Sequence, residues 1–254
     1  MKKGLCRLCL QERRLLTRSH IIPEFMYGSL FDKHHKMYKL RPAEFMRGIK
    51  KVVRQTSGEY ESNVLCEECD TLRLNQYESY AKEVVRKTHS RILLNGCDDE
   101  TTPEGIKFRR CDGVDCRKFK LFLLSILWRA SISTREMFRE IMIGHEHEEA
   151  IRSMIMKADP GQGDQYPVIM ISHLGDPATP GDLVGQPGSS PVNGRARFVF
   201  PIGGVTYLFH LSMEAVPDGF QPYILQDIGL VKLLYTPKGM AWNLLMNYFG
   251  ANPA

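Results

Sequence analysis

The sequence holds two cysteine pairs with the same spacing, Cys6-Arg7-Leu8-Cys9 and Cys66-Glu67-Glu68-Cys69. Two residues between thiolates is the spacing of a tight knuckle turn, and two such pairs can supply the four ligands of a tetrahedral zinc site. We therefore predict a structural zinc bound by Cys6, Cys9, Cys66 and Cys69; the alternative is four unrelated buried thiols. A closed four-thiolate site leaves no position for water, so it would stabilise the fold and not catalyse a reaction.

Composition excludes several classes of protein. The chain has 254 residues, of which 43% are hydrophobic and 25% charged, as expected for a globular protein. Its longest apolar run, residues 119–132, is interrupted by Lys120 and Arg129 and is shorter than the roughly 18 to 20 residues that cross a bilayer. The first residues lack the apolar core of a secretory signal, so we expect a cytoplasmic protein, in which paired cysteines more often bind metal than form disulfides.

Charge is unevenly divided along the chain. Residues 1–95 contain 19 Lys and Arg against 11 Asp and Glu, whereas residues 96–254 contain 15 against 18. The first part therefore carries +8 and the second −3, which sum to the net charge of +5. A basic segment of this kind favours a polyanionic partner such as nucleic acid, since neutralising phosphates releases counterions. A solvated basic surface is the alternative.

A third motif, Ser19-His20-Ile21-Ile22-Pro23, lies between the cysteine pairs. Together with Cys6, Cys9 and Leu65-Cys66-Glu67-Glu68-Cys69, it resembles the zinc-supported HNH endonucleases over roughly residues 5–80. The resemblance implies a ββα-metal fold, in which a catalytic histidine on a hairpin faces a helix. The sequence departs from the family at three positions: Ser19 replaces an acidic metal ligand, Asp70 replaces His or Asn, and Glu61 stands in place of the central asparagine, with Asn63 nearby but out of register.

The resemblance implies a set of catalytic residues. His20 would be the general base that activates water, while one Mg²⁺ or Mn²⁺ polarises the phosphate. Asp70, together with Glu61, would supply hard oxygen ligands for that ion, and Asn63 is the candidate for the asparagine role. Other roles remain open: His20 can be a structural histidine or contact phosphate, and Asp70 can cap the following helix.

Basic residues around this motif are candidates for contacts with nucleic acid. They are Arg18, Lys50, Lys51, Arg54 and Arg73, the last standing where the family commonly has lysine. His34 and His35 are adjacent, so their side chains would point to opposite faces of an extended chain. We therefore interpret them mainly as part of an exposed basic loop and not as metal ligands.

Periodicity predicts the remaining elements. Three- and four-residue steps predict helices over residues 70–95, 117–133 and 145–157. Residues 96–116 are acidic and turn-rich, which is typical of a linker; a second metal site of Cys111, Asp112, Asp115 and Cys116 is one interpretation of it, and ordinary thiols are the other. Candidate strands cover residues 167–173, 195–200, 205–211, 223–227 and 230–235, and a last helix covers residues 238–248.

These patterns predict an α+β protein, with a small zinc-bound ββα-metal or treble-clef-like module at residues 1–95, a linker at 96–116 and a larger α+β domain at 117–254. The expected function is metal-dependent cleavage of DNA, and by analogy of fold a role in bacterial or phage defence. The alternatives are a non-catalytic zinc-containing nucleic-acid-binding or adaptor protein and a protein-interaction scaffold. The C-terminal domain carries no nucleotide-binding motif, and we expect it to recognise a protein partner or to self-associate.

Overall fold

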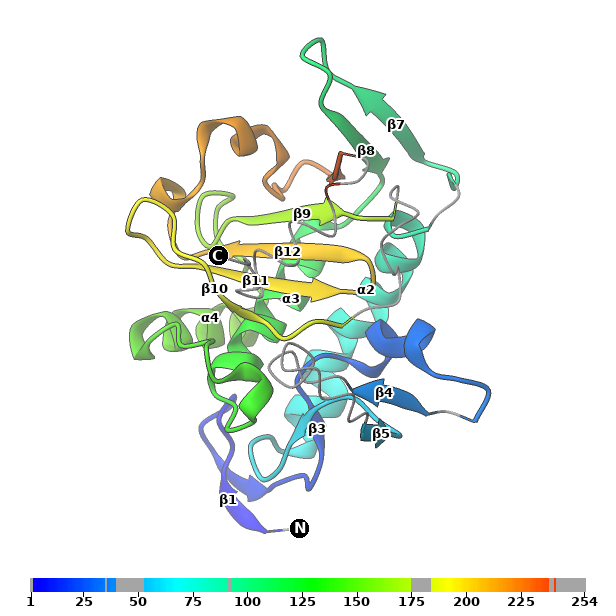
Figure 1. The fold of residues 1–254 in the computed structure, drawn as a ribbon. Coiled ribbons are helices and arrows are strands. Elements are labelled where there is room, and N and C mark those ends of the chain that lie inside the picture. Colours follow the sequence, from blue (N-terminus) through cyan, green and yellow to red (C-terminus); the bar gives the residue numbers. More distant parts are fainter. Residues whose placement is uncertain are drawn as a thin grey trace, which may run out of the picture.

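The computed structural model describes residues 2–34, 36–39, 53–90, 93–174, 184–237 and residue 240. Within them the chain is α+β, as predicted: a seven-stranded sheet is flanked by helices, and small two-stranded sheets belong to the N-terminal part (Figure 1). No helix of the described part is long and apolar enough to cross a membrane.

The N-terminal part is built from short hairpins. Strand β1 (Lys3–Leu5) pairs with β2 (Glu12–Arg14), β3 (Ser19–His20) with β6 (Tyr60–Glu61), and β4 (Met37–Lys39) with β5 (Val53–Gln55). The 3-10 segment η1 (Glu24–Leu30) follows Pro23. Strands of two or three residues bury little apolar surface, so a crosslink such as a metal site would contribute much of the stability of this part.

Gly58 lies in the turn between β5 and β6 and is required by packing. A Cβ at this position would come within 2.4 Å of the Tyr27 ring. The Tyr27 side chain is itself buried in the main core. The close approach of the backbone to the Tyr27 ring therefore explains the glycine at this position.

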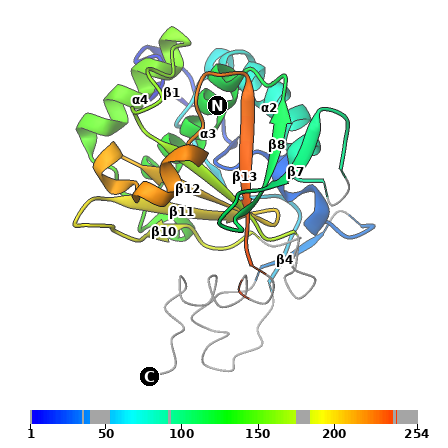
Figure 2. The same ribbon diagram turned by 90° about the horizontal axis from the view of Figure 1, so that it is seen from above.

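The helices pack together on one side of the sheet (Figure 2). A π-helical turn, η2 (Glu68–Leu74), leads into α2 (Asn75–Thr88), and the chain continues through α3 (Cys116–Ser131) and α4 (His145–Lys157). Helix α3 is buried almost throughout because its apolar residues cover all sides, while Asp115 caps its start by accepting from the Lys118 N–H. The predicted helices over residues 117–133 and 145–157 are therefore confirmed, and that over 70–95 is shorter.

The large sheet has the order β10-β11-β12-β9-β13-β8-β7, and all neighbours are antiparallel except β9 and β13. Its strands are β7 (Cys97–Thr101), β8 (Lys107–Asp112), β9 (Val168–Ser172), β10 (Gly188–Ser189), β11 (Arg197–Ile202), β12 (Val205–His210) and β13 (Leu230–Tyr235). Four of the five predicted strands are confirmed. The fifth, over residues 223–227, is wrong: that stretch follows the 3-10 turn η5 (Asp218–Tyr223) as extended chain outside the sheet.

Alternation along the strands builds two cores. Phe198 and Phe200 of β11 face the helices and share one cluster with α3, whereas Val199 faces the opposite side of the sheet. There it packs with η5 and with Met213 and Val216, in and just after the 3-10 turn η4 (Met213–Ala215). The 3-10 turn η3 (Glu136–Phe138) packs on the other side, because Phe138 belongs to the core shared with α3. Both faces of the sheet are therefore covered.

Residues 96–116 are not a linker. They form the β7–β8 hairpin at the edge of the large sheet, where Asp98 pairs with Arg110 and Asp99 with Arg109. Opposite charges on facing positions stabilise this pairing, which explains why an acidic stretch forms a strand. The main core also runs from Leu8 and Tyr77 of the N-terminal part into Phe122 of α3, so apolar packing joins the two predicted domains. The predicted helix over residues 238–248 lies outside the described residues.

Candidate functional site

The four predicted cysteines come together. The sulfur atoms of Cys6, Cys9, Cys66 and Cys69 lie within 4.8 Å of one another, and three of the four residues are buried. The first pair sits on the turn between β1 and β2, where the Leu10 N–H donates to the Cys6 carbonyl and Leu10 takes a left-handed conformation (φ 58°). The second pair opens η2. The cluster could hold a structural metal ion such as zinc.

The cluster has the dimensions that a tetrahedral zinc site requires. Sulfurs about 2.3 Å from a zinc ion stand roughly 3.8 Å apart, and the Cys9 and Cys66 sulfurs are 4.0 Å apart. The Cys66 N–H points at the Cys6 sulfur at 3.4 Å, a contact that favours a thiolate there. A hydrogen bond from the Cys69 side chain lowers the pKa of Cys6 to about 4, against the raising effect of burial. The donor set therefore suits a thiophilic divalent ion.

The β3–β6 hairpin meets η2 at two residues that are 51 positions apart. The Ser19 hydroxyl donates to Asp70 Oδ1. Ser19 is 3% exposed, and Asp70 is half-buried in the first turn after the cysteines. The Asp70 carboxylate does not cap the helix, because its own N–H bonds to the Cys66 carbonyl and no side-chain cap is present at this end. The Ser19 and Asp70 side chains, which come from β3 and from η2, are therefore in contact.

His20 lies next to this contact on β3. Its carbonyl accepts from Arg129 Nη1 at 2.7 Å, while its Nε2 is enclosed and has no hydrogen-bond partner among the described residues. An enclosed ring nitrogen without a partner is costly to bury unless a water or a ligand meets it. Its placement is therefore compatible with a histidine that exchanges a proton with a bound molecule.

A buried arginine fixes the carbonyl side of the hairpin. Arg129 of α3 is 4% exposed and forms an ion pair with Glu78 of α2 at 2.8 Å. It also bonds to the carbonyl and hydroxyl of Ser125. Arg129 thus has a carboxylate partner inside the fold. Glu78 has this structural task and is not part of the candidate metal site.

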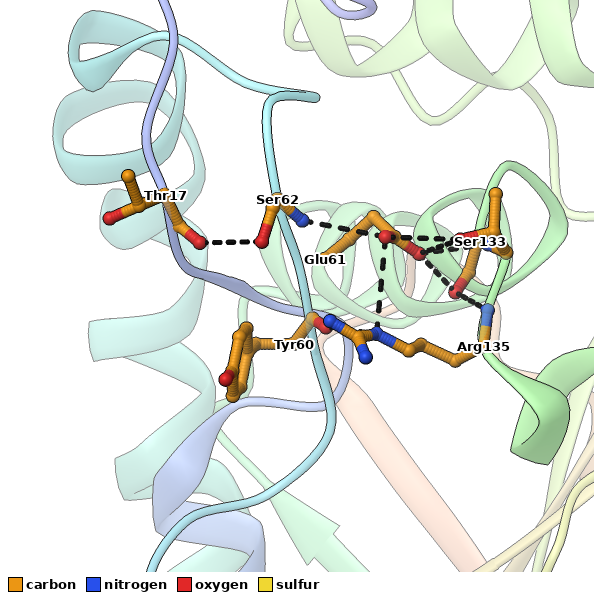
Figure 3. A network of polar contacts seen from close by, with 7 residues as sticks. Thr17, Tyr60, Glu61, Ser62, Ser133 and Arg135 are labelled. Carbon is orange, nitrogen blue, oxygen red and sulfur yellow. Dashed lines mark hydrogen bonds and ion pairs between the residues drawn. The ribbon is translucent and has the colours of Figure 1, made fainter. Parts of the chain in front are cut away.

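Glu61 is bound to the C-terminal part of the chain (Figure 3). Its carboxylate accepts from the Ser133 hydroxyl at 2.8 Å and from the N–H of Thr134 at 2.8 Å, and Arg135 Nε lies 3.9 Å away. Burial raises the pKa of Glu61, but the hydrogen bonds from Thr134 and Ser133 outweigh it and hold the pKa below its usual range. The ionised carboxylate thus binds the loop after α3 through hydrogen bonds. A role of Glu61 as a metal ligand stays a prediction.

Asn63 is exposed and takes a left-handed conformation (φ 59°), with its N–H donating to the Leu16 carbonyl. Asparagine tolerates this conformation better than most residues, so a turn is sufficient to explain it. A catalytic role for Asn63 stays a prediction.

The five basic residues that were predicted to contact nucleic acid lie in different parts of the structure. Arg18 is exposed beside the hairpin, whereas Arg73 donates to the Met156 carbonyl at 3.0 Å and ties η2 to α4. Arg54 belongs to β5, and Lys50 and Lys51 lie outside the described residues. Only Arg18 of these five is therefore placed at the candidate site with its side chain described.

The interpretation of residues 111–116 as a metal site is not favoured. Cys111 forms a disulfide with Cys97 across β7 and β8, and the Cys116 thiol donates to the Leu230 carbonyl. Within the described residues, the four-cysteine cluster is the one group of three or more potential ligands close enough to share an ion. His35 lies outside these residues.

Sequence reasoning missed the residues that connect the hairpin to α3, namely Ser133, Thr134 and Arg135. They follow a helix end in a polar stretch, which gives no signal of a long-range contact.

No family model, curated protein or solved structure matches this chain.

Proposed function

We propose that this protein is a metal-dependent endonuclease of the HNH type that cleaves DNA, with a structural zinc at the four cysteines. The observation that carries the proposal is the contact between Ser19 and Asp70, which joins the hairpin to the helix beside His20. Ser19 and Asp70 are 51 positions apart in the sequence, and their contact supports the proposal.

Each residue of the site has a task in this proposal. Asp70 supplies one carboxylate ligand, and Ser19 orients that carboxylate. One carboxylate is compatible with Mg²⁺, which is commonly bound by one or two carboxylates, several waters and the phosphates of the substrate. The ion would polarise the scissile phosphate and stabilise the leaving oxygen. His20 takes the proton from the attacking water through its unpartnered Nε2.

Asp70→Asn tests this arrangement, because it removes the ligand charge and keeps the size of the side chain. We expect DNA cleavage to fall by about 100-fold or more, as is typical for the loss of a positioned metal ligand or its supporting group. Glu68→Gln is the matched control in the same turn, since Glu68 is exposed and its one ion pair with a described residue is a long contact of 3.9 Å with Arg13. Equal cleavage by the two variants would exclude Asp70 from the site.

A non-catalytic DNA-binding protein is the second candidate, and the engagement of Glu61 favours it. Its carboxylate is occupied by Ser133 and Thr134, which leaves Asp70 as the one of the two predicted carboxylate ligands that is not bound by the loop after α3. This candidate predicts DNA binding that is sensitive to salt, without cleavage in Mg²⁺ or Mn²⁺.

A further inference from the structure

Two arginines from distant parts of the chain gather at one aromatic ring. The guanidinium carbon of Arg18 lies 4.4 Å from the Tyr60 ring centroid, and that of Arg135 lies 5.1 Å from it. The two carbons are therefore no more than about 9.5 Å apart, the sum of these distances. Tyr60 is the cross-strand partner of His20, so both positive charges stand beside the candidate catalytic histidine.

Arg135 is held at this place by the hairpin itself. Its Nε donates to the Tyr60 carbonyl at 2.7 Å, and its backbone N–H donates to the Ser133 hydroxyl at 3.0 Å. Glu61 binds the same loop, as Figure 3 shows. A guanidinium has five N–H groups, and within the described residues the terminal nitrogens of Arg135 make no hydrogen bond. They remain able to bind an anion.

Arg18 is held more loosely. One terminal nitrogen donates to the Ser57 hydroxyl at 2.8 Å, and the side chain is exposed. Two like charges this close repel each other. The face of the Tyr60 ring and the Glu61 carboxylate, 3.9 Å from Arg135 Nε, compensate them only in part. An anion between or across them would relieve the repulsion, and planar guanidinium groups are well suited to bind phosphate in a bidentate manner.

We propose that Arg18 and Arg135 together bind the phosphate backbone of duplex DNA next to His20, an inference that rests on the proposed function. Successive phosphates on one strand advance about 3.4 Å along the helix axis, so two cations within 9.5 Å can contact the same phosphate or neighbouring ones. Arg135 belongs to the part of the chain that follows the zinc module. The C-terminal part thus contributes directly to substrate binding, and Glu61 acts as a positioning residue for it.

The test is fluorescence anisotropy with a labelled 20-base-pair DNA duplex, over a series of salt concentrations, in EDTA-free buffer with Ca²⁺ in place of Mg²⁺ to prevent cleavage. Arg135→Gln and Arg18→Gln should each weaken binding about tenfold, the loss expected for one charge-assisted hydrogen bond to phosphate. Each should also reduce the slope of log K against log salt by about 0.9. Arg139→Gln is the matched control, because Arg139 is exposed, pairs with Glu136 and lies four residues from Arg135.

The controls separate the possible failures. Zinc content and circular dichroism identify a folded variant, and Arg18→Gln keeps the test decisive if Arg135→Gln does not fold. Equal affinity of Arg135→Gln, Arg18→Gln and Arg139→Gln would overturn the inference while leaving the nuclease proposal intact. If Arg135→Gln and Arg18→Gln bind DNA more weakly and the wild type does not cleave it, the inference is upheld and the proposed nuclease activity is contradicted. A greater effect on duplex RNA than on DNA would overturn the choice of DNA.

Discussion

The ion pair between Arg129 and Glu78 gives the sharpest prediction about stability. The Arg129 side chain is 4% exposed and that of Glu78 22% exposed, and their closest atoms are 2.8 Å apart. In Glu78→Gln the guanidinium would keep its bonds to the His20 carbonyl and to Ser125, but it would lose its only counter-charge within the described residues. The arginine would then be a buried, uncompensated charge.

Removing one partner of a fully buried pair costs about 3–5 kcal/mol, and the partial exposure of Glu78 lowers this. We therefore expect Glu78→Gln to reduce the free energy of unfolding by about 2–3 kcal/mol. Glu83→Gln is the matched control on the same helix. Its pair with Arg86 is 65–68% exposed, so the expected loss is about 0–0.5 kcal/mol.

The assay is urea unfolding at pH 7 with zinc present, followed by the fluorescence of buried Trp128, which precedes Arg129 on α3. The slope of the free energy against urea should be unchanged, so that the midpoint alone moves. If Glu78→Gln is no less stable than Glu83→Gln, the ion pair contributes nothing to the hairpin, and the account of how His20 is positioned is wrong.

Three further predictions concern other parts of the molecule. Removing metal with a strong chelator should release one zinc per chain and unfold the N-terminal hairpins, because a structural zinc supplies folding free energy. A colorimetric zinc assay and circular dichroism measure the two effects. Absence of bound zinc in the purified protein would contradict the site. Gly58→Ala should cost about 1–3 kcal/mol in urea unfolding, since its Cβ would lie 2.4 Å from the Tyr27 ring; an unchanged midpoint would contradict the packing. Burial, with a smaller effect of Arg109, lowers the pKa of His89 to about 3, so the unfolded chain binds the extra proton between about pH 6.5 and pH 3 and stability falls as the pH falls through that window. Urea unfolding at pH 6.5 and pH 5 should therefore show a loss about 2 kcal/mol larger in the wild type than in His89→Gln, and equal losses would refute the shift.

Local patterns were enough to predict several elements. Helix α4 has the bounds that the sequence predicts, and β12 and β13 are confirmed as strands; β12 is buried at every position. The C-x-x-C spacing predicted which four cysteines meet, because a knuckle turn is a local structure and few other cysteines compete.

The contacts that position the site could not be predicted from the sequence. Asp99 and Arg109 become partners only once β7 and β8 pair, so residues 97–101 were interpreted as part of a linker. Glu61 and Thr134 lie 73 positions apart, and their contact depends on the packing of α3 against the zinc module. Neither residue type nor spacing carries that information.

We propose that His20 catalyses metal-dependent cleavage of DNA. The most direct measurement is plasmid nicking in Mg²⁺ or Mn²⁺ by the wild type, His20→Ala and His34→Ala, the last an exposed histidine of the same module. Our account predicts nicking by the wild type and His34→Ala and none by zinc-loaded, folded His20→Ala. Equal nicking by all three proteins would contradict the role of His20, and DNA binding without nicking by any of them would favour the non-catalytic candidate.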